Sequence, residues 1–230
     1  MTERHESLQP ETAAVKEVVR RHWDGRAASF DEGTTHGLLT DAQRSAWTDR
    51  VRAWAGPGPV DALDVGCGTG FFSLLLAELG HRPTGVDVAE SMLARTREKA
   101  AAAGLTVDLR LADTEALPFP DDSFDLVIER HVIWTLPEPT RALSEWARVL
   151  RPGGQLILVE GEWGGLRAGG HGDYDAIREA LPLYGGRPAA ELAEIVRAGG
   201  FTRSVTEPLM TAELWVTEPE RERYALRAWS

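Results

Sequence analysis

Glycine and acid residues in one short segment give the strongest indication of chemistry in this chain. Gly66, Gly68 and Gly70 alternate directly after an apolar run, and Asp64 lies two residues before the first of them. Alternating glycines let the backbone turn sharply and approach a ligand closely, and a helix that starts after such a turn offers N–H groups to that ligand. The spacing is G-x-G-x-G, whereas dinucleotide sites use G-x-G-x-x-G to hold a pyrophosphate. Because Asp64 would repel a phosphate, the segment favours a ligand with an ammonium group.

Two further acids follow apolar runs that are typical of strands. Asp87 ends the run 82–87, where a carboxylate can accept hydrogen bonds from both hydroxyls of a ribose. Asp113 and Thr114 follow the run 106–111, where Asp113 could accept a hydrogen bond from the amino group of an adenine. Each acid also has a purely structural interpretation, Asp87 as the cap of the next helix and Asp113 as a turn residue. The pattern leaves both interpretations open.

The run 124–129 leads into side chains that suit the acceptor side of a reaction. His131 is the candidate general base, because an unperturbed imidazole titrates near neutral pH. Glu129 could orient a ligand, and Trp134 could form a pocket wall whose aromatic face attracts a positive charge. The alternatives are that His131 only packs or forms hydrogen bonds, and that Trp134 belongs to the core.

The elements that must position these residues alternate between strands and helices. Apolar runs predict strands at 60–65, 82–87, 106–111, 124–129 and 155–160, with helices at 71–80, 90–103 and 139–150. Several runs are continuously apolar, which is typical of a parallel sheet covered by helices on both faces. The pattern predicts a doubly wound α/β fold, in which ligands bind beyond the carboxyl ends of the strands. Two late strands are predicted at 201–207 and 212–217, followed by a helical tail from Glu218.

Segments outside this alternation are expected to cover the site. Helices are predicted at about 11–30 and 41–55, so residues 1–56 should form a helical cap and residues 57–230 the ligand-binding domain. Residues 161–187 form a glycine-rich segment longer than a strand connection needs, and long loops are often functional. We expect it to be an acceptor-side insertion, although a short helix at 173–181 that only packs is an alternative. Its candidate substrate-binding residues are Trp163, His171, Tyr174 and Tyr184.

Composition narrows the class of partner. The formal net charge is −11 over 230 residues, which argues against a nucleic-acid substrate. No apolar stretch approaches the ~20 residues of a membrane span. Cys67 is the single cysteine, so no disulfide can form within the chain and a reducing cytoplasm is expected. No acidic oxygen cluster indicates a metal site. We therefore expect a cytoplasmic monomer or homodimer that takes a small molecule, without nucleic acid, membrane or metal.

Four motifs, in this order and at these spacings, resemble those of the class I S-adenosylmethionine-dependent methyltransferases, and more narrowly the methyltransferase domain 11 group. The motifs are DVGCGTG from residue 64, GVDVAESML from 85, ADTEALPFPDDSFDLVI from 112 and LRPGGQLILVE from 150. The resemblance covers about residues 60–160. It implies a seven-stranded sheet whose last strand is antiparallel and inserted beside the sixth. S-adenosylmethionine has an ammonium and no phosphate, as the acid beside the glycines requires.

The resemblance also implies roles for individual residues. Asp64 and the loop 66–70 would hold the methionine moiety, Asp87 the ribose and Asp113 the adenine amino group, with Met92 packed near the adenine. Trp23, Arg26 and Phe30 would belong to a lid over the cofactor. The predicted cofactor-binding set is Asp64, Gly66, Cys67, Gly68, Gly70, Asp87, Val88, Met92, Asp113, Thr114 and Glu129.

The expected activity is therefore transfer of a methyl group from S-adenosylmethionine to an O, N or C atom of a small molecule, such as a secondary metabolite. His131 is the candidate catalytic residue, and Trp134 joins the candidate substrate-binding residues. No D/N-P-P-Y sequence follows the fourth strand, which argues against amide or adenine nitrogens as targets. The alternative is an S-adenosylmethionine-binding protein with a regulatory role or a different reaction.

Overall fold

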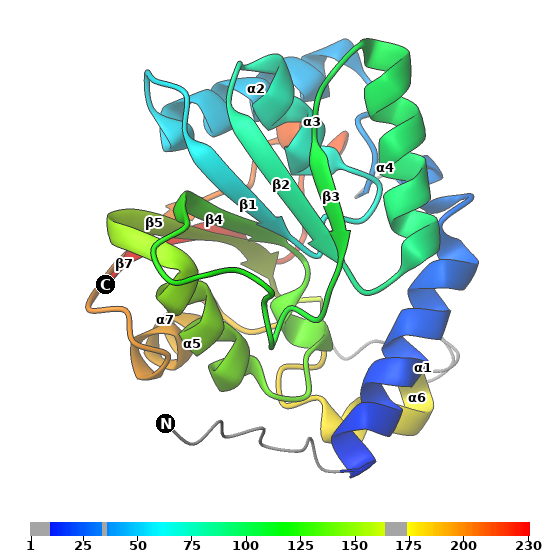
Figure 1. The fold of residues 1–230 in the computed structure, drawn as a ribbon, viewed down its shortest axis with the longest axis vertical. Helices are drawn as coiled ribbons and strands as arrows, with labels where there is room; N and C mark the ends of the chain where they lie inside the picture. Colours follow the sequence, from blue (N-terminus) through cyan, green and yellow to red (C-terminus); the bar gives the residue numbers. More distant parts are fainter. Residues whose placement is uncertain (1–9, 34–35, 164–173) are drawn as a thin grey trace.

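The core of the molecule is a seven-stranded sheet in the order β3-β2-β1-β4-β5-β7-β6 (Figure 1). The computed structural model describes residues 10–33, 36–163 and 174–230. The strands are β1 (Asp61–Val65), β2 (Arg82–Asp87), β3 (Asp108–Leu111), β4 (Phe124–Arg130), β5 (Leu150–Gly161), β6 (Arg203–Pro208) and β7 (Arg223–Trp229). The first five strands are parallel, and β7 runs antiparallel between β5 and β6. The predicted doubly wound sheet with an antiparallel last strand is confirmed.

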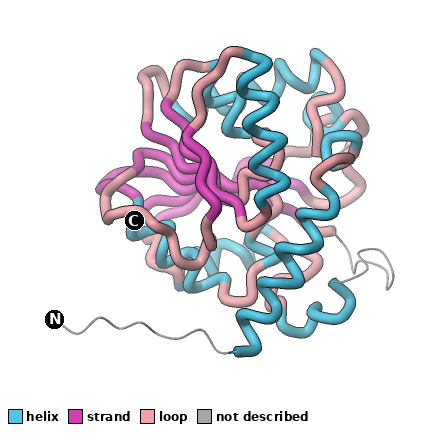
Figure 2. The backbone as a smooth tube through the Cα atoms, turned by 45° about the vertical axis from the view of Figure 1, so that its right-hand side comes forward, coloured by secondary structure: helices cyan, strands magenta, loops and turns pink. Residues whose placement is uncertain are grey.

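Helices cover both faces of this sheet, and Figure 2 shows the strands as a central layer between them. The α-helices are α1 (Pro10–Arg26), α2 (Asp41–Ala55), α3 (Phe71–Glu78), α4 (Glu90–Ala103), α5 (Pro139–Val149), α6 (Tyr174–Ile177), α7 (Ala189–Ala198) and α8 (Ala212–Trp215). Short 3-10 helices are η1 (Phe30–Glu32), η2 (Ile133–Thr135) and η3 (Arg178–Ala180).

The apolar runs of the central strands feed two cores, one on each face of the sheet. In β4, Val127 packs with buried residues of α5 and α7, whereas Leu126 and Ile128 pack with buried residues of α2, α3 and α8. Alternate side chains of a strand point to opposite faces, so a strand buried on both sides must be apolar throughout. Burial of these strands on both faces therefore explains the continuous apolar runs in the sequence.

The two helices that precede the sheet have different positions. Helix α2 packs on the sheet face beside α3, where Trp47 and Trp54 are buried and the Trp47 indole N–H donates to the Leu214 carbonyl at 2.8 Å. Helix α1 instead runs along the side of the molecule against α4 and α6 (Figure 1). Of these two helices, only α1, together with η1 after it, is therefore positioned to cover a ligand bound at the strand ends.

The C-terminal segment differs from the sequence prediction. Residues 212–217 do not form a strand, because Leu214 and Trp215 are buried in the short helix α8 and the Trp215 indole N–H donates to the Leu209 carbonyl. The tail that was predicted to be helical is β7, in which Tyr224, Leu226 and Ala228 are buried. Arg221, Glu222 and Arg223 at its start hide the alternation of a strand in the sequence. Within the described residues, no helix is both long and apolar enough to cross a bilayer.

Candidate functional site

A cavity of about 360 Å³ lies at the carboxyl ends of β1, β2, β3 and β4. The chain order places β2 and β3 on one side of β1 and β4 on the other, and ligands of doubly wound sheets bind at such a reversal. The predicted residues that line it are Asp64, Gly66, Cys67, Gly68, Asp87, Val88, Met92, Asp113, Thr114, His131, Trp134 and Trp163. Trp23, Arg26 and Phe30, the candidate lid residues, line it as well.

The glycine turn is held against two neighbouring strands. The Cys67 N–H donates to the Val86 carbonyl at 2.9 Å, and Gly66 and Gly68 have φ angles of 62° and 54°. A Cβ atom on Gly66 would lie 2.5 Å from the Val132 side chain. Glycine is therefore required there both by the left-handed backbone and by the close approach of the β4 loop.

Two buried carboxyl groups flank the turn. Asp64 accepts hydrogen bonds from the Ser73 N–H at 2.8 Å and the Ser73 hydroxyl at 2.6 Å, and burial raises its pKa to about 7. Asp87 accepts from the N–H groups of Gly68 and Ala89, and burial raises its pKa to about 6. A ligand that donates hydrogen bonds or carries positive charge would favour the ionised form of both.

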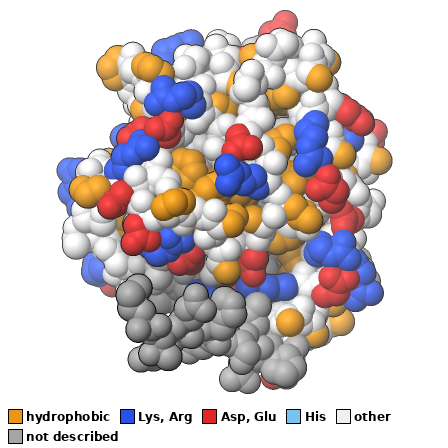
Figure 3. All heavy atoms as spheres, in the orientation of Figure 1, with side chains coloured by type: hydrophobic (Ala, Val, Ile, Leu, Met, Phe, Trp, Pro, Cys, Tyr) orange, Lys and Arg blue, Asp and Glu red, His pale blue; other side chains and the backbone are white. Residues whose placement is uncertain are grey.

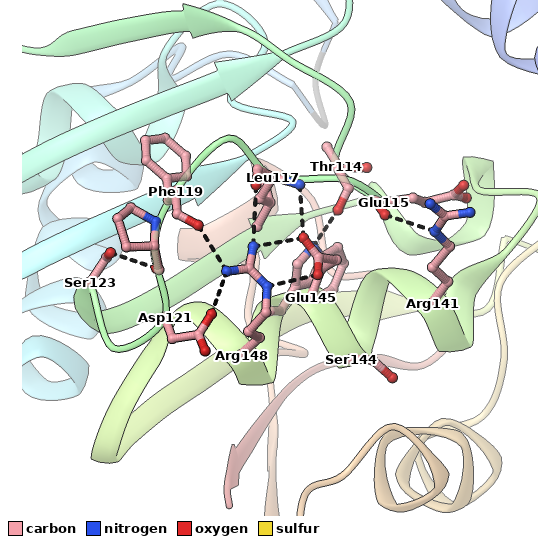
Figure 4. Close-up of polar contacts among 12 residues, drawn as sticks. Thr114, Glu115, Leu117, Phe119, Asp121, Ser123, Arg141, Ser144, Glu145 and Arg148 are labelled. Atoms are coloured by element: carbon pink, nitrogen blue, oxygen red, sulfur yellow. Dashed lines mark hydrogen bonds and ion pairs between the residues drawn. The ribbon is translucent and has the colours of Figure 1, made fainter. Parts of the chain in front are cut away.

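The segment after β3 is fixed by side chains of α5 (Figure 4). Arg148 donates to the carbonyls of Leu117 and Phe119, and Arg141 donates to the Glu115 carbonyl at 3.1 Å. The Trp146 indole N–H donates to the Thr114 carbonyl at 3.0 Å. These contacts hold Asp113 and Thr114 at the cavity, although no sequence motif marks the α5 side chains as part of the site.

Helix α1 closes this end of the cavity through Lys16. Its ammonium pairs with Asp113 at 2.7 Å and with Glu115, whose side chain is fully buried. The Thr114 hydroxyl is buried and has no hydrogen-bond partner among the described residues. A buried polar atom of this kind indicates room for a hydrogen-bonding ligand.

His131 lies at the other end of the cavity. The backbone φ angle of His131 is 61°, and its backbone N–H donates to the Val159 carbonyl at 3.1 Å. The imidazole is edge-on to Trp163, with ring centroids 4.3 Å apart, and stacks on Trp215 at 5.8 Å. Burial and the nearby Arg130 hold the pKa of His131 well below its usual value. The ring is therefore neutral near neutral pH.

Comparison with known proteins assigns the chain to a family. Residues 63–158 match the sequence profile of the family described as methyltransferase domain. The chain is 36% identical over 177 residues to the demethylmenaquinone methyltransferase of Thermus thermophilus, an alignment that covers 66% of this chain and 78% of that protein. The chain belongs to the class I S-adenosylmethionine-dependent methyltransferases. The predicted family is thereby confirmed.

Other relatives of this methyltransferase differ in what they act on. The present chain is 39% identical over 127 residues to a phosphatidylethanolamine N-methyltransferase of Cereibacter sphaeroides, and the alignment covers 54% of this chain and 59% of that relative. The solved structure of the [4+2]-cyclase SpnF superposes with a TM-score of 0.70 at 24% identity and covers 92% of this chain and 95% of that one. At this identity the likeness concerns the fold alone.

The residues of this methyltransferase fit its cofactor. S-adenosylmethionine offers an ammonium and ribose hydroxyls, which are the donors that two buried carboxyl groups beside a glycine turn require. Asp64 would hold the ammonium, Asp87 the ribose, and Asp113 with Thr114 the adenine edge. Cys67, Val88 and Met92 line the same cavity and supply its apolar surface.

Some predicted residues lie elsewhere. Gly70 is the N-cap residue of α3, with a φ angle of 90°, and does not line the cavity. Glu129 is fully buried beneath it and accepts from the Val132 N–H at 2.8 Å. Tyr174 and Tyr184 pack in the core beside Trp134. His171 lies outside the described residues.

The cavity-lining residues that sequence reasoning missed include Lys16, Phe71, Arg130 and Arg223. Arg130 had a detectable signal, because a cation at the carboxyl end of a buried strand of a doubly wound sheet lies at the ligand edge. Arg223 had none, since its place follows from the insertion of β7 beside β5.

Proposed function

We propose that this methyltransferase transfers a methyl group to a small molecule whose reacting end lies among His131, Trp134 and Trp163. One observation supports the proposal above others. The cavity is continuous from the acids at the ends of β1, β2 and β3 to an aromatic wall beyond β4, so a cofactor held at the acids would open onto the space beside that wall.

The roles of the residues follow from this division of the cavity. When bound, S-adenosylmethionine supplies a methyl carbon attached to a positively charged sulfur. The protein contributes mainly by holding the acceptor in line with that carbon, which can supply a large share of a rate acceleration. Trp23 and Phe30, whose rings meet edge-on at 5.8 Å, cover the site and exclude water, so α1 and η1 act as the lid.

His131 orients the acceptor in this proposal. A neutral imidazole can accept a hydrogen bond or a proton, but a depressed pKa makes it a weak base. The base role therefore suits only an acceptor that loses its proton easily.

A small molecule also agrees with the surface of the protein. Acidic and basic side chains alternate over the face in Figure 3, and neither sign forms a continuous field among its described residues. A nucleic-acid substrate would require a basic surface that neutralises phosphates.

Calorimetric titration tests the cofactor half of the proposal. The purified protein should bind S-adenosylhomocysteine with micromolar affinity and should not bind NAD. Incubation with S-adenosylmethionine and an acceptor should then release S-adenosylhomocysteine together with a product heavier by one methyl group in place of hydrogen. Tight cofactor binding with a rearranged but unmethylated product would instead support a different reaction, as in the cyclase that shares the fold.

A further inference from the structure

Carboxyl groups are confined to one half of the cavity, which Lys16 and Arg26 also line. The carboxyl groups that line it are Asp64, Asp87 and Asp113, at the ends of β1, β2 and β3. At the ends of β4, β5 and β7, the titratable side chains that line it are Arg130, His131 and Arg223. Among the described lining residues, none at this acceptor end is a carboxylate.

The Arg223 guanidinium is fixed in place over an aromatic wall. It lies 4.0 Å from the centre of the Trp163 ring, and its Nη1 atom donates to the carbonyls of Glu162 and Glu222. Burial lowers the pKa of Arg223, which means that its positive charge is partly stripped of water. An anion bound in the cavity would offset that cost.

The nearest buried carboxyl groups do not supply a base for the acceptor. Glu129 and Glu160 are both fully buried and neither lines the cavity. Burial raises the pKa of Glu129 to about 8, and burial together with Glu129 raises that of Glu160. Both shifts favour the protonated, uncharged forms of these groups, which weakens their ability to balance the charge of Arg223.

The walls of the acceptor end are flat and aromatic. Trp163 faces His131 at this end, Trp134 lines the same cavity, and Phe71 lies under the Arg130 guanidinium at 3.5 Å. Such walls suit a planar ligand, and the guanidinium groups beside them suit a negative charge.

From this arrangement we infer the class of acceptor, an inference that rests on the proposed function. The acceptor is a planar molecule with an acidic hydroxyl group, a phenol or an enol, which binds as its anion beside Arg223 and against Trp163. Its proton goes to solvent before binding. An oxygen lone pair then forms the bond to the methyl carbon, and the electron pair of the broken C–S bond stays on sulfur. The negative acceptor and the positive sulfonium become a neutral ether and a neutral thioether.

An amine acceptor fits this end poorly. At neutral pH an aliphatic amine is a cation, which the Arg223 guanidinium at this end would repel. His131, with its depressed pKa, would be a weak base for removing the ammonium proton. An oxyanion needs neither a base nor a carboxylate partner.

Two isosteric probes test the inference by binding rather than by turnover. We would measure the affinities of 2-hydroxy-1,4-naphthoquinone, an acidic enol, and 2-amino-1,4-naphthoquinone, a neutral compound of the same shape, with S-adenosylhomocysteine saturating. A charged hydrogen bond contributes ~1.5–3 kcal/mol, so the hydroxy compound should bind about tenfold or more tightly. Arg223→Gln should abolish this preference, and Arg223→Lys should retain part of it. Arg221→Gln, which removes an exposed arginine outside the cavity, is the matched control and should leave it intact.

The outcomes separate this inference from the proposed function. Failure of the wild-type protein to bind S-adenosylhomocysteine would defeat the proposed function itself. With that ligand bound, equal affinities for the two probes, no binding of the hydroxy compound, or a preference that survives Arg223→Gln would overturn the inference. Normal affinity of a variant for S-adenosylhomocysteine verifies that the variant is folded. If Arg223→Gln fails that check, the preference of the Arg223→Lys protein between the two probes tests the inference in its place.

Discussion

At the residue scale, the Asp87 carboxylate joins two parts of the site. One oxygen accepts from Gly68 in the glycine turn and the other from Ala89 before α4. Each carboxylate oxygen has a further lone pair for a ribose hydroxyl. Asp87→Asn removes the charge and one acceptor, and a charge-assisted hydrogen bond contributes ~1.5–3 kcal/mol. Affinity for S-adenosylhomocysteine should therefore fall about tenfold by calorimetry. Asp108→Asn, at the exposed start of β3, is the control, and unchanged affinity of the Asp87 variant would remove Asp87 from the ribose site.

The side chains of the cofactor half could be predicted because each lies at or shortly after the carboxyl end of a strand. Asp64, Asp87 and Thr114 lie in one cavity since parallel strands end at one edge of the sheet. The acceptor half was less accessible to sequence reasoning. Tyr184 and Trp163 come from the same segment, yet only Trp163 lines the cavity, and no pattern in a glycine-rich segment indicates which aromatic ring turns inward.

At the scale of elements, the glycine turn and the β4 loop must pack without an intervening side chain. Gly66→Ala places a Cβ atom 2.5 Å from Val132 at a φ angle of 62°, and a left-handed backbone costs a non-glycine residue ~1–2 kcal/mol. We expect a loss of about tenfold or more in affinity for S-adenosylhomocysteine and a lower melting temperature. Gly25→Ala in α1, whose Cβ would meet nothing within 4 Å, is the control and should stabilise the protein by roughly 0.5 kcal/mol. A Gly66→Ala protein that binds normally would show that the β4 loop yields easily.

Helix α1 is joined to the β3 loop by a buried charge. Lys16→Met leaves the Glu115 side chain, which is fully buried, without its ammonium partner. Breaking such a pair from one side destabilises proteins by ~3 kcal/mol, and urea unfolding should measure a loss of this order. The double variant Lys16→Met/Glu115→Gln should recover part of it, because no charge is then stranded. Arg21→Met, at an exposed position of the same helix, should have little effect. A double variant no more stable than Lys16→Met would assign the loss to packing of α1 instead.

The elements themselves were predictable where their residues are buried on a regular period. The central parallel strands and α3 to α5 follow that rule, although β5 begins at Leu150, five residues before its predicted start. β3 is mostly exposed, and its position was nevertheless predicted to within two residues. The end of the chain did not follow it. Two charged residues precede β7, and a third, Arg223, is its first residue. Arg223 reaches the cavity, and the Glu222 carboxylate accepts a hydrogen bond from the Ala189 N–H. These contacts require charged side chains where an alternating strand pattern would otherwise be visible in the sequence.

At the scale of the whole molecule, pH links stability to cofactor binding. Burial raises the pKa of Asp64 to about 7 and that of Asp87 to about 6, from 3.8 in the unfolded chain. A carboxyl group whose pKa is raised by folding contributes its stability below the unfolded pKa, and that contribution is lost as pH rises through the folded value. For these two groups, the free energy of unfolding without ligand should therefore decrease between about pH 4 and pH 7. Asp64→Asn should flatten this part of the profile in urea unfolding.

Cofactor binding should have the opposite dependence on pH. In the proposed site, Asp64 and Asp87 must be ionised to accept from the ammonium and hydroxyl donors of S-adenosylhomocysteine, so affinity should rise with pH and level off above about pH 7. One pKa unit corresponds to ~1.4 kcal/mol, which predicts affinity about tenfold or more weaker near pH 5.5 than near pH 8. Binding below pH 7 should also release protons, measurable by calorimetry in buffers of different ionisation enthalpy. In the Asp64→Asn variant, the change in affinity centred near pH 7 should disappear, while the change near pH 6 that is due to Asp87 should remain. An affinity that is flat from pH 5.5 to pH 8 would mean that neither carboxyl group changes its protonation when the cofactor binds, and that the ammonium and ribose are held by other atoms.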